Sequence, residues 1–282
     1  MSPLFDFTDY GALLGLVTNS LIAGALLGVV GGLIGFFVMA RDLPFAVHGI
    51  SELSFAGAAG ALLIGVNVVA GSIAGSLLAA VLIALLGARA RERNSVIGVL
   101  MPFGLGLGIL FLALYPGGSA NRFGLLTGQV VSVDTPQVMA LSVVALVVLA
   151  GLLVVWRPLL FASVDEEVAT ARGVPVRSLS LVFMVLLALT VSIAVQTVGA
   201  LLVLALLVTP AAAALRVASG PLAVSLLSML FAVVSIVGGI LLALGAAIPI
   251  SPYVTTISFT IYLVCRLLGH RPRRATVVHS AP

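Results

Sequence analysis

Charge is scarce in this chain of 282 residues: only 8% of them are Asp, Glu, Lys or Arg, and lysine is absent altogether. All thirteen basic residues other than histidine are therefore arginine. Without a lysine the chain has neither a Walker A motif nor a Schiff-base amine, so it cannot by itself act as a P-loop ATPase. The single cysteine, Cys265, permits no internal disulfide.

Apolar residues dominate instead. They make up 62% of the chain, and the mean hydropathy is +1.33. A soluble fold does not need so much apolar surface, whereas several membrane spans do. The apolar residues form long unbroken runs, while a β-barrel would show short alternating segments. The sequence therefore predicts an all-α polytopic protein of the cell membrane. Residues 1–282 form a single transmembrane domain with a basic tail from about residue 269.

The apolar runs divide into about nine predicted transmembrane segments. They lie at 17–40, 44–66, 69–87, 96–114, 138–156, 221–244 and 250–268, with two more within 179–218 that are separated at 196–199. With the N-terminus outside and the C-terminus cytoplasmic, every arginine except Arg122 lies on the cytoplasmic side, as the positive-inside rule favours. These arginines are scattered among short loops, so the pI of 10.0 does not indicate nucleic-acid binding.

His48 and Glu52 are the only histidine and the only acid within a predicted span. Their four-residue spacing places both side chains on one face of a helix. If that helix enters the membrane near Pro44, Glu52 lies about 12 Å deep, where a carboxylate costs roughly 2.5–3.5 kcal/mol. Such residues usually face a polar path or a partner.

Two interpretations of this pair stay open from the sequence. The first is structural, with both side chains hydrogen-bonded across helices. The second is a transport site for a divalent cation, because imidazole nitrogen and carboxylate oxygen suit zinc and manganese and thiol ligands are missing. Two ligands are few for tight binding, but a symmetric dimer would supply two of each.

The loop at 161–176 has the pattern of a short helix. Ser163 can cap its start, and Asp165, Glu166 and Glu167 fall in the first turn, where the helix dipole favours acids. Gly173 can end it. By spacing alone the pattern favours an ordinary solvated surface helix.

Glycine patterns in the spans indicate close helix packing. Gly24, Gly28 and Gly32 recur every four residues, and the glycines at 104–108 lie in a span with no preceding strand, so they do not form a nucleotide-binding loop. Thr209-Pro210 predicts a kink.

Three stretches together resemble one family, the membrane permeases of ABC importers for zinc and manganese. They are F-A-S-V-D-E-E-V-A-T-A-R-G-V-P-V at 161–176, Q-T-V-G-A-L-L-V-L-A-L-L-V-T-P-A-A-A-A at 196–214 and R-D-L-P-F-A-V-H-G-I-S-E at 41–52. The last is similar to the family segment R-R-M-S-F-x-x-D-A-L-S-H, with His48 where the family has aspartate and Glu52 where it has histidine. A second departure is N-S-V-I-G at 94–98, where the family tends to read D-T-A-I-G.

This resemblance implies a transport subunit of an ATP-driven importer that is not itself an enzyme. The divalent metal, zinc or manganese, is then the transported substrate bound by His48 and Glu52, and no cofactor is permanently bound. The implied partners are a cytoplasmic ABC ATPase, an extracytoplasmic metal-binding protein and a second copy of the chain. The residues expected to face the ATPase are Asp165, Glu166, Glu167, Ala169, Arg172 and Gly173.

Two rival functions remain at this stage. One is an ABC permease for a siderophore or cobalamin, which would need a wide pathway and no pair of metal ligands. The other is a secondary transporter driven by protons through Glu52, which would work without any ATPase. An intramembrane enzyme is the weakest reading because the pair has no evident nucleophile beside it and no H-E-x-x-H helix.

Overall fold

The computed structural model describes residues 17–87, 90–117, 133–244 and 250–269, and within these ranges it contains helices and no strand. The basic tail lies outside the described residues except for Gly269. The helices are α2 (Thr18–Ala40), α3 (Pro44–Ile64), α4 (Val68–Leu86), α5 (Ala90–Leu114), α7 (Thr135–Val164), α8 (Glu166–Ala171), α9 (Val176–Val198), α10 (Ala200–Leu207), α11 (Thr209–Val217), α12 (Pro221–Leu244) and α13 (Ile250–Leu268).

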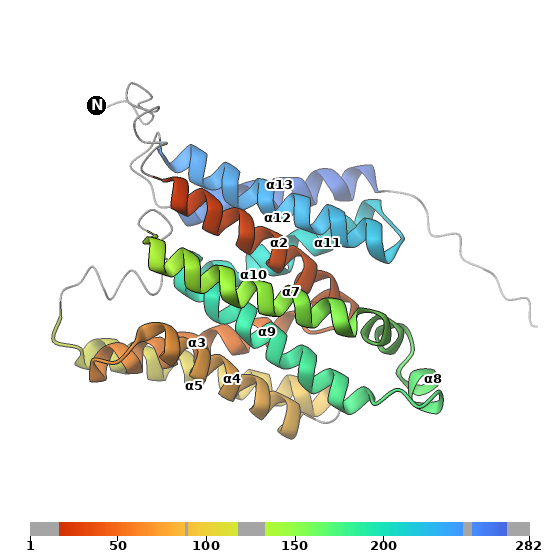
Figure 1. Cartoon of the computed structure of the whole chain (residues 1–282), viewed down its shortest axis with the longest axis horizontal. Helices are drawn as coiled ribbons and strands as arrows, with labels where there is room; N and C mark the ends of the chain where they lie inside the picture. The colour runs from red at the N-terminus through yellow and green to blue at the C-terminus, as the bar shows by residue number, and fades with distance from the viewer. Residues whose placement is uncertain (1–16, 88–89, 118–132, 245–249, 270–282) are drawn as a thin grey trace, which may run out of the picture.

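Eight of these helices are long and apolar enough to cross a membrane. The all-α polytopic prediction is therefore confirmed. The short helices α10 and α11 follow one another between α9 and α12 and run in the direction opposite to both (Figure 1). Together they take the place of the second of the two segments predicted within 179–218. The first residues of α2 and the last of α13 accordingly lie at opposite ends of the bundle (Figure 1).

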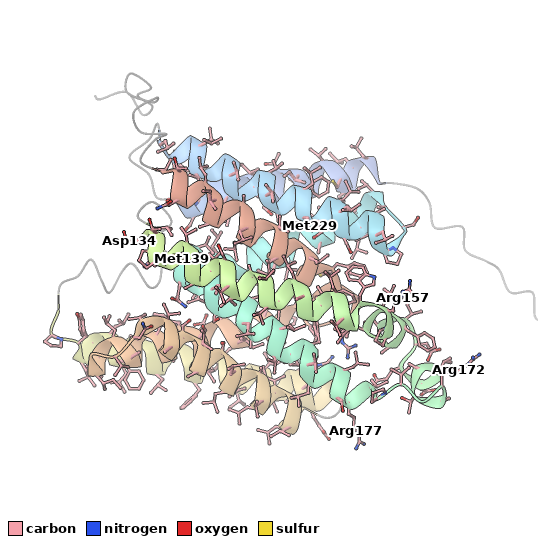
Figure 2. All side chains as sticks on the ribbon, viewed as in Figure 1. Asp134, Met139, Arg157, Arg172, Arg177 and Met229 are labelled. Carbon is pink, nitrogen blue, oxygen red and sulfur yellow. The ribbon has the colours of Figure 1, made fainter. Side chains whose placement is uncertain are left out.

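Arginines mark one end of the bundle. Arg157, Arg172 and Arg177 lie there with α8, while Asp134 lies at the other end (Figure 2). We call this the arginine-rich end; that it faces the cytoplasm stays a prediction from the positive-inside rule.

The long apolar run at 179–218 is divided where the sequence predicts. Helix α9 ends at Val198, and Gly199 has φ +83°, a conformation that glycine adopts without steric cost. A second interruption at Val208 separates α10 from α11, directly before Thr209-Pro210. Val208 keeps helical dihedral angles and the Ala212 N–H donates to its carbonyl at 2.9 Å, so the interruption is local and lies at the predicted kink.

Helix α7 is longer than the predicted span at 138–156. It starts at Thr135, where the Gln137 side chain accepts a hydrogen bond of 3.2 Å from the Asp134 N–H. It also continues through Pro158 to Val164. The helix therefore extends beyond the predicted span at both ends.

Helix α2 packs face to face with α12 through its glycines. A Cβ atom added at Gly32 would lie 2.5 Å from the Met229 Cα, so the two backbones meet at a distance that only glycine allows. The Ser228 hydroxyl also donates a 2.7 Å hydrogen bond to the Gly32 carbonyl. Gly24 and Gly28 face the same helix, which confirms the predicted packing role of the three glycines.

We expect Gly32→Ala to destabilise the bundle, because its methyl group would collide with backbone atoms of α12 that cannot rotate away. The expected loss is about 1–3 kcal/mol, measured as a lower thermal unfolding temperature of the purified protein in detergent. Gly238→Ala is the control, since its Cβ would meet only the flexible Ile257 Cδ1 at 3.2 Å. Equal unfolding temperatures for the two variants would contradict the close α2–α12 contact.

Candidate functional site

The turn between α2 and α3 fixes where α3 begins. The Leu43 N–H donates to the Val38 carbonyl at 2.9 Å and the Asp42 N–H to the Met39 carbonyl at 3.4 Å, the two bonds of a Schellman motif. Asp42 takes the left-handed conformation at φ +54°, which aspartate tolerates better than most residues. Helix α3 then starts at Pro44, so His48 and Glu52 follow one and two turns later.

The structure brings His48 and Glu52 together as the spacing predicts. The His48 Nε2 lies 3.7 Å from the Glu52 Oε1, beyond hydrogen-bond distance. The Glu52 residue is only 3% exposed, whereas the His48 side chain is 30% exposed. The two remaining polar atoms, His48 Nδ1 and Glu52 Oε2, are buried and have no hydrogen-bond partner among the described residues. The contacts between helices expected of a purely structural pair are thus not present in the part of the chain described.

Helix α5 lies directly against the face of α3 that carries this pair. A Cβ at Gly104 would lie 3.0 Å from the Glu52 carbonyl carbon, and one at Gly108 would collide with the Phe55 ring. Both glycines therefore pack against α3, which confirms that the 104–108 pattern serves helix packing. Gly106 has no atom within 4 Å of its added Cβ.

Helix α4 holds the neighbouring face of α3 with hydroxyl groups. The Ser54 and Ser72 hydroxyl oxygens lie 2.8 Å apart, and Ser72 also donates to the Ser192 carbonyl of α9 at 3.2 Å. These contacts join three helices beside the site. Glu52 is therefore held on a helix that is clamped from two sides.

The described residues contain no group of three or more His, Cys, Asp and Glu side chains that could hold a metal ion. One chain thus offers an imidazole and a carboxylate. Structural zinc sites use four protein ligands. A site with two ligands is better suited to an ion that is released again than to an ion that stays bound.

The predicted helix in the 161–176 loop is α8, at the arginine-rich end (Figure 1). Asp165 caps its start, since its carboxylate accepts a 2.9 Å hydrogen bond from the Val168 N–H. The prediction that Ser163 is the cap is wrong because α7 runs on to Val164, and the Ser163 hydroxyl donates to the Leu159 carbonyl inside that helix.

The end of α8 is as the sequence predicts. Gly173 has φ +81° and ends the helix in a Schellman motif, in which the Val174 N–H donates to the Ala169 carbonyl at 3.0 Å. Ala169 is fully buried and anchors α8 on α7 and α9. The other residues that were expected to face a partner are exposed, namely Asp165, Glu166, Glu167, Arg172 and Gly173.

Arg41 was counted in the sequence only as a positive charge, but it joins three helices. Its guanidinium donates hydrogen bonds to the hydroxyls of Ser163 at the end of α7 and Ser180 in α9. It also lies 5.8 Å from the centre of the Phe183 ring. Burial lowers the pKa of Arg41, and the nearby negative charge of Glu166 acts in the opposite direction. These partners are more than 120 residues away in sequence, so no local pattern reveals them.

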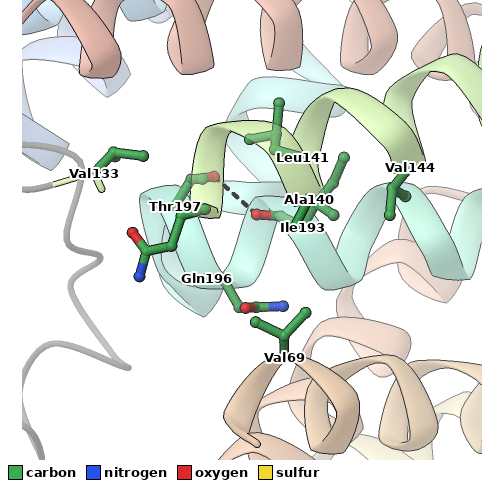
Figure 3. A pocket seen from close by; sticks show the side chains of 9 residues that line it. Val69, Val133, Ala140, Leu141, Val144, Ile193, Gln196 and Thr197 are labelled. Atoms are coloured by element: carbon green, nitrogen blue, oxygen red, sulfur yellow. Dashed lines mark hydrogen bonds between the residues drawn. The ribbon is translucent and has the colours of Figure 1, made fainter. Parts of the chain in front are cut away.

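A small cavity lies between the first residues of α4 and α7 and the last turns of α9 (Figure 3). Its volume of 40 Å³ has room for little more than one or two waters. The polar side chains on its wall are amides and a hydroxyl, and the Thr197 hydroxyl donates to the Ile193 carbonyl at 2.9 Å. It therefore lacks the ligands of a metal path. The lining residues are Val69, Val133, Gln137, Ala140, Leu141, Val144, Ile193, Gln196 and Thr197.

Known proteins resemble this chain over most of its length. The manganese transport system membrane protein MntC of Halalkalibacterium halodurans is 30% identical over 241 residues, which are 85% of this chain and 82% of MntC. The high-affinity zinc uptake system membrane protein ZnuB of Haemophilus influenzae is 24% identical over 225 residues, 79% of this chain and 86% of ZnuB. The structure of PsaBC from Streptococcus pneumoniae in complex with Fab superposes with a TM-score of 0.83 at 26% identity, covering 92% of this chain and 95% of that one.

The model of the ABC 3 transport family matches residues 14–269, which include every described helix from α2 to the end of α13. The chain therefore belongs to the ABC 3 transport family.

Proposed function

We propose that this chain is the membrane permease subunit of an ATP-driven importer for manganese or zinc. The observation that carries the proposal is the buried pair of His48 and Glu52, whose Nδ1 and Oε2 atoms have no partner among the described residues. The manganese and zinc transport names of its relatives support the metal. They favour a metal ion over a siderophore or cobalamin, and membership of an ABC family favours ATP over a proton gradient.

In this proposal the metal is a substrate in transit and no cofactor is permanently bound. His48 supplies a nitrogen and Glu52 an oxygen, which is the mixed donor set that both zinc and manganese accept. The carboxylate also offsets part of the charge of the divalent ion. A homodimer would bring a second pair to the same axis, giving four ligands during passage and two once the pairs separate.

The energy must come from another chain, because this one has no lysine for a Walker A motif. We assign the docking of a cytoplasmic ATPase to α8, whose exposed acidic first turn projects at the arginine-rich end (Figure 2). An extracytoplasmic metal-binding protein would deliver the ion to the opposite end.

Arg41 connects α8 with the pair of His48 and Glu52, which we call the metal pair. It faces Glu166 electrostatically, holds the ends of α7 and α9, and precedes His48 by only seven residues. A shift of α8 would therefore move the α2–α3 turn and with it the start of α3. Arg41 is a positioning residue in this scheme.

We expect Glu52→Gln and His48→Ala each to abolish metal uptake. The amide keeps the shape of the carboxylate but loses the negative charge that a divalent ion needs. The measurement is uptake of radioactive manganese and zinc into proteoliposomes that contain the complete complex, with assembly checked by co-purification of the ATPase. Asp42→Asn is the control, because it removes an exposed carboxylate in the preceding turn and asparagine also tolerates a left-handed φ.

Uptake at the wild-type rate in both variants would refute the assignment of His48 and Glu52 as metal ligands. If the pair only formed a structural hydrogen bond, Glu52→Gln should cost about 1 kcal/mol of stability and leave transport running.

A bulky residue at the end of α8 should separate ATP hydrolysis from transport. We expect Gly173→Val to lower the metal taken up per ATP hydrolysed several-fold, because β-branched residues tolerate φ +81° poorly and α8 would lose its ending. Gly65→Val is matched to it: Gly65 has φ +73° at the end of α3, far along the chain from α8. An unchanged ratio in Gly173→Val would argue strongly against docking through α8.

Arg41→Lys tests the connection at the ends of α7 and α9. Lysine keeps the charge but cannot reach both serines with a planar fork, so uptake per ATP should fall while the ATPase stays bound. Arg177→Lys is the control, since Arg177 is exposed at the same end. The role of Arg41 is refuted if both variants couple as the wild type does.

A further inference from the structure

A groove at the arginine-rich end has no role in the metal path described above. It is a wide, open depression of 980 Å³ where the last turns of α7 face the start of α12. Its lining is apolar apart from one cation. The lining residues are Trp156, Arg157, Leu160, Phe161, Val164, Gly220, Pro221, Leu222 and Ala223.

The length of α7 places this groove at the depth of lipid headgroups. The helix has 30 residues and is therefore about 45 Å long, whereas the hydrocarbon core is about 30 Å thick. A span of some 20 residues from Val138 ends near Arg157. The start of α12 at Pro221 lines the same groove, so the two helices leave the hydrocarbon side by side.

The flanks of the groove are apolar and open. On α7, Leu153 and Val154 are exposed, and on α12, Leu222 and Leu226 are exposed. Exposed large apolar side chains on membrane-spanning helices contact either lipid or another membrane protein. The groove therefore opens onto an exposed apolar surface at the level where the headgroups begin.

Two side chains give the groove a fixed wall and a charge. The Trp156 ring stacks on Phe36 at 6.2 Å between centroids and meets Phe37 edge-on at 5.0 Å. Next to it, Arg157 is exposed and makes no hydrogen bond or ion pair with the described residues. Tryptophan and arginine together are typical anchors at the membrane interface.

We propose that this groove binds an anionic phospholipid, with the Arg157 guanidinium on the headgroup phosphate and an acyl chain running from the groove into the hydrocarbon along the exposed Leu153 and Leu226. A guanidinium matches a phosphate with two parallel hydrogen bonds. No acid lines the groove to neutralise Arg157 from within, and basic pockets between helices on the cytoplasmic side are the places where anionic headgroups bind. This site is independent of the metal pair and of α8.

The test is lipid retention by the full-length protein, measured by native mass spectrometry. The purified, delipidated chain is mixed with equal amounts of phosphatidylglycerol and phosphatidylcholine that carry the same acyl chains. The wild type should retain phosphatidylglycerol over phosphatidylcholine by about fivefold, the weight of one arginine near an anionic surface. Arg157→Gln should remove this preference, whereas the control Arg177→Gln, at the same end on α9, should keep it.

A second variant tests the groove itself and not only its charge. Ala223→Trp fills the groove from an exposed position, so folding should be unaffected and retention of both lipids should fall. Equal retention of the two lipids by the wild type would overturn the proposal. So would an unchanged preference in Arg157→Gln, or a Leu222→Cys variant that cross-links to a second copy or to the ATPase in native membranes, since the groove would then be covered by protein.

Discussion

A carboxylate buried among membrane-spanning helices is the constraint on which the rest of this structure depends. Glu52 is nearly inaccessible, and a lone ionised acid at that depth is costly. An imidazole lies one turn away but beyond hydrogen-bond distance, and α4 and α5 close around α3 through glycines and serines. Without such close packing, lipid would reach the pair and leave its free atoms in hydrocarbon. The same packing leaves the His48 side chain 30% exposed.

The helix ends that surround Arg41 show how a distant event could reach this pair. Three spans converge on one guanidinium, and the first of them continues into the turn that starts α3. Arginine suits such a position because its planar group can serve two hydroxyls and an aromatic face at once. The start of α3 and the ends of α7 and α9 are therefore linked through the turn and the hydrogen bonds of Arg41.

Features that depend on neighbours in sequence could be predicted. Three features follow from local signals, and the structure has each where it was expected. They are the four-residue spacing of His48 and Glu52, the glycine at the end of α8 and the end of α9 before Gly199. The end of α7 was not predicted, because the apolar run stops before Arg157 whereas the helix continues through Pro158 to Val164. The cap of α8 is accordingly Asp165 and not Ser163.

Contacts between residues far apart in sequence could not be predicted. The role of Arg41 and the groove between α7 and α12 both arise from helices that meet only in the fold. No periodicity or motif carries that information. The sequence marked Ser163 only as a possible helix cap and Ser180 only as part of an apolar run.

The interrupted seventh crossing, α10 followed by α11, has a consequence for how the protein is made. With eight and nine residues, neither helix can cross a bilayer, and the interruptions free backbone groups at membrane depth. Exposure of such a segment to lipid alone, after it leaves the ribosome, would be unfavourable because its free backbone groups would have no hydrogen-bond partners. The segment must be received by helices that are already inserted, and α10 does contact α2, α3 and α9, which all precede it in the chain. The order of synthesis thus supplies the protein surface that shelters this segment before α12 and α13 are made.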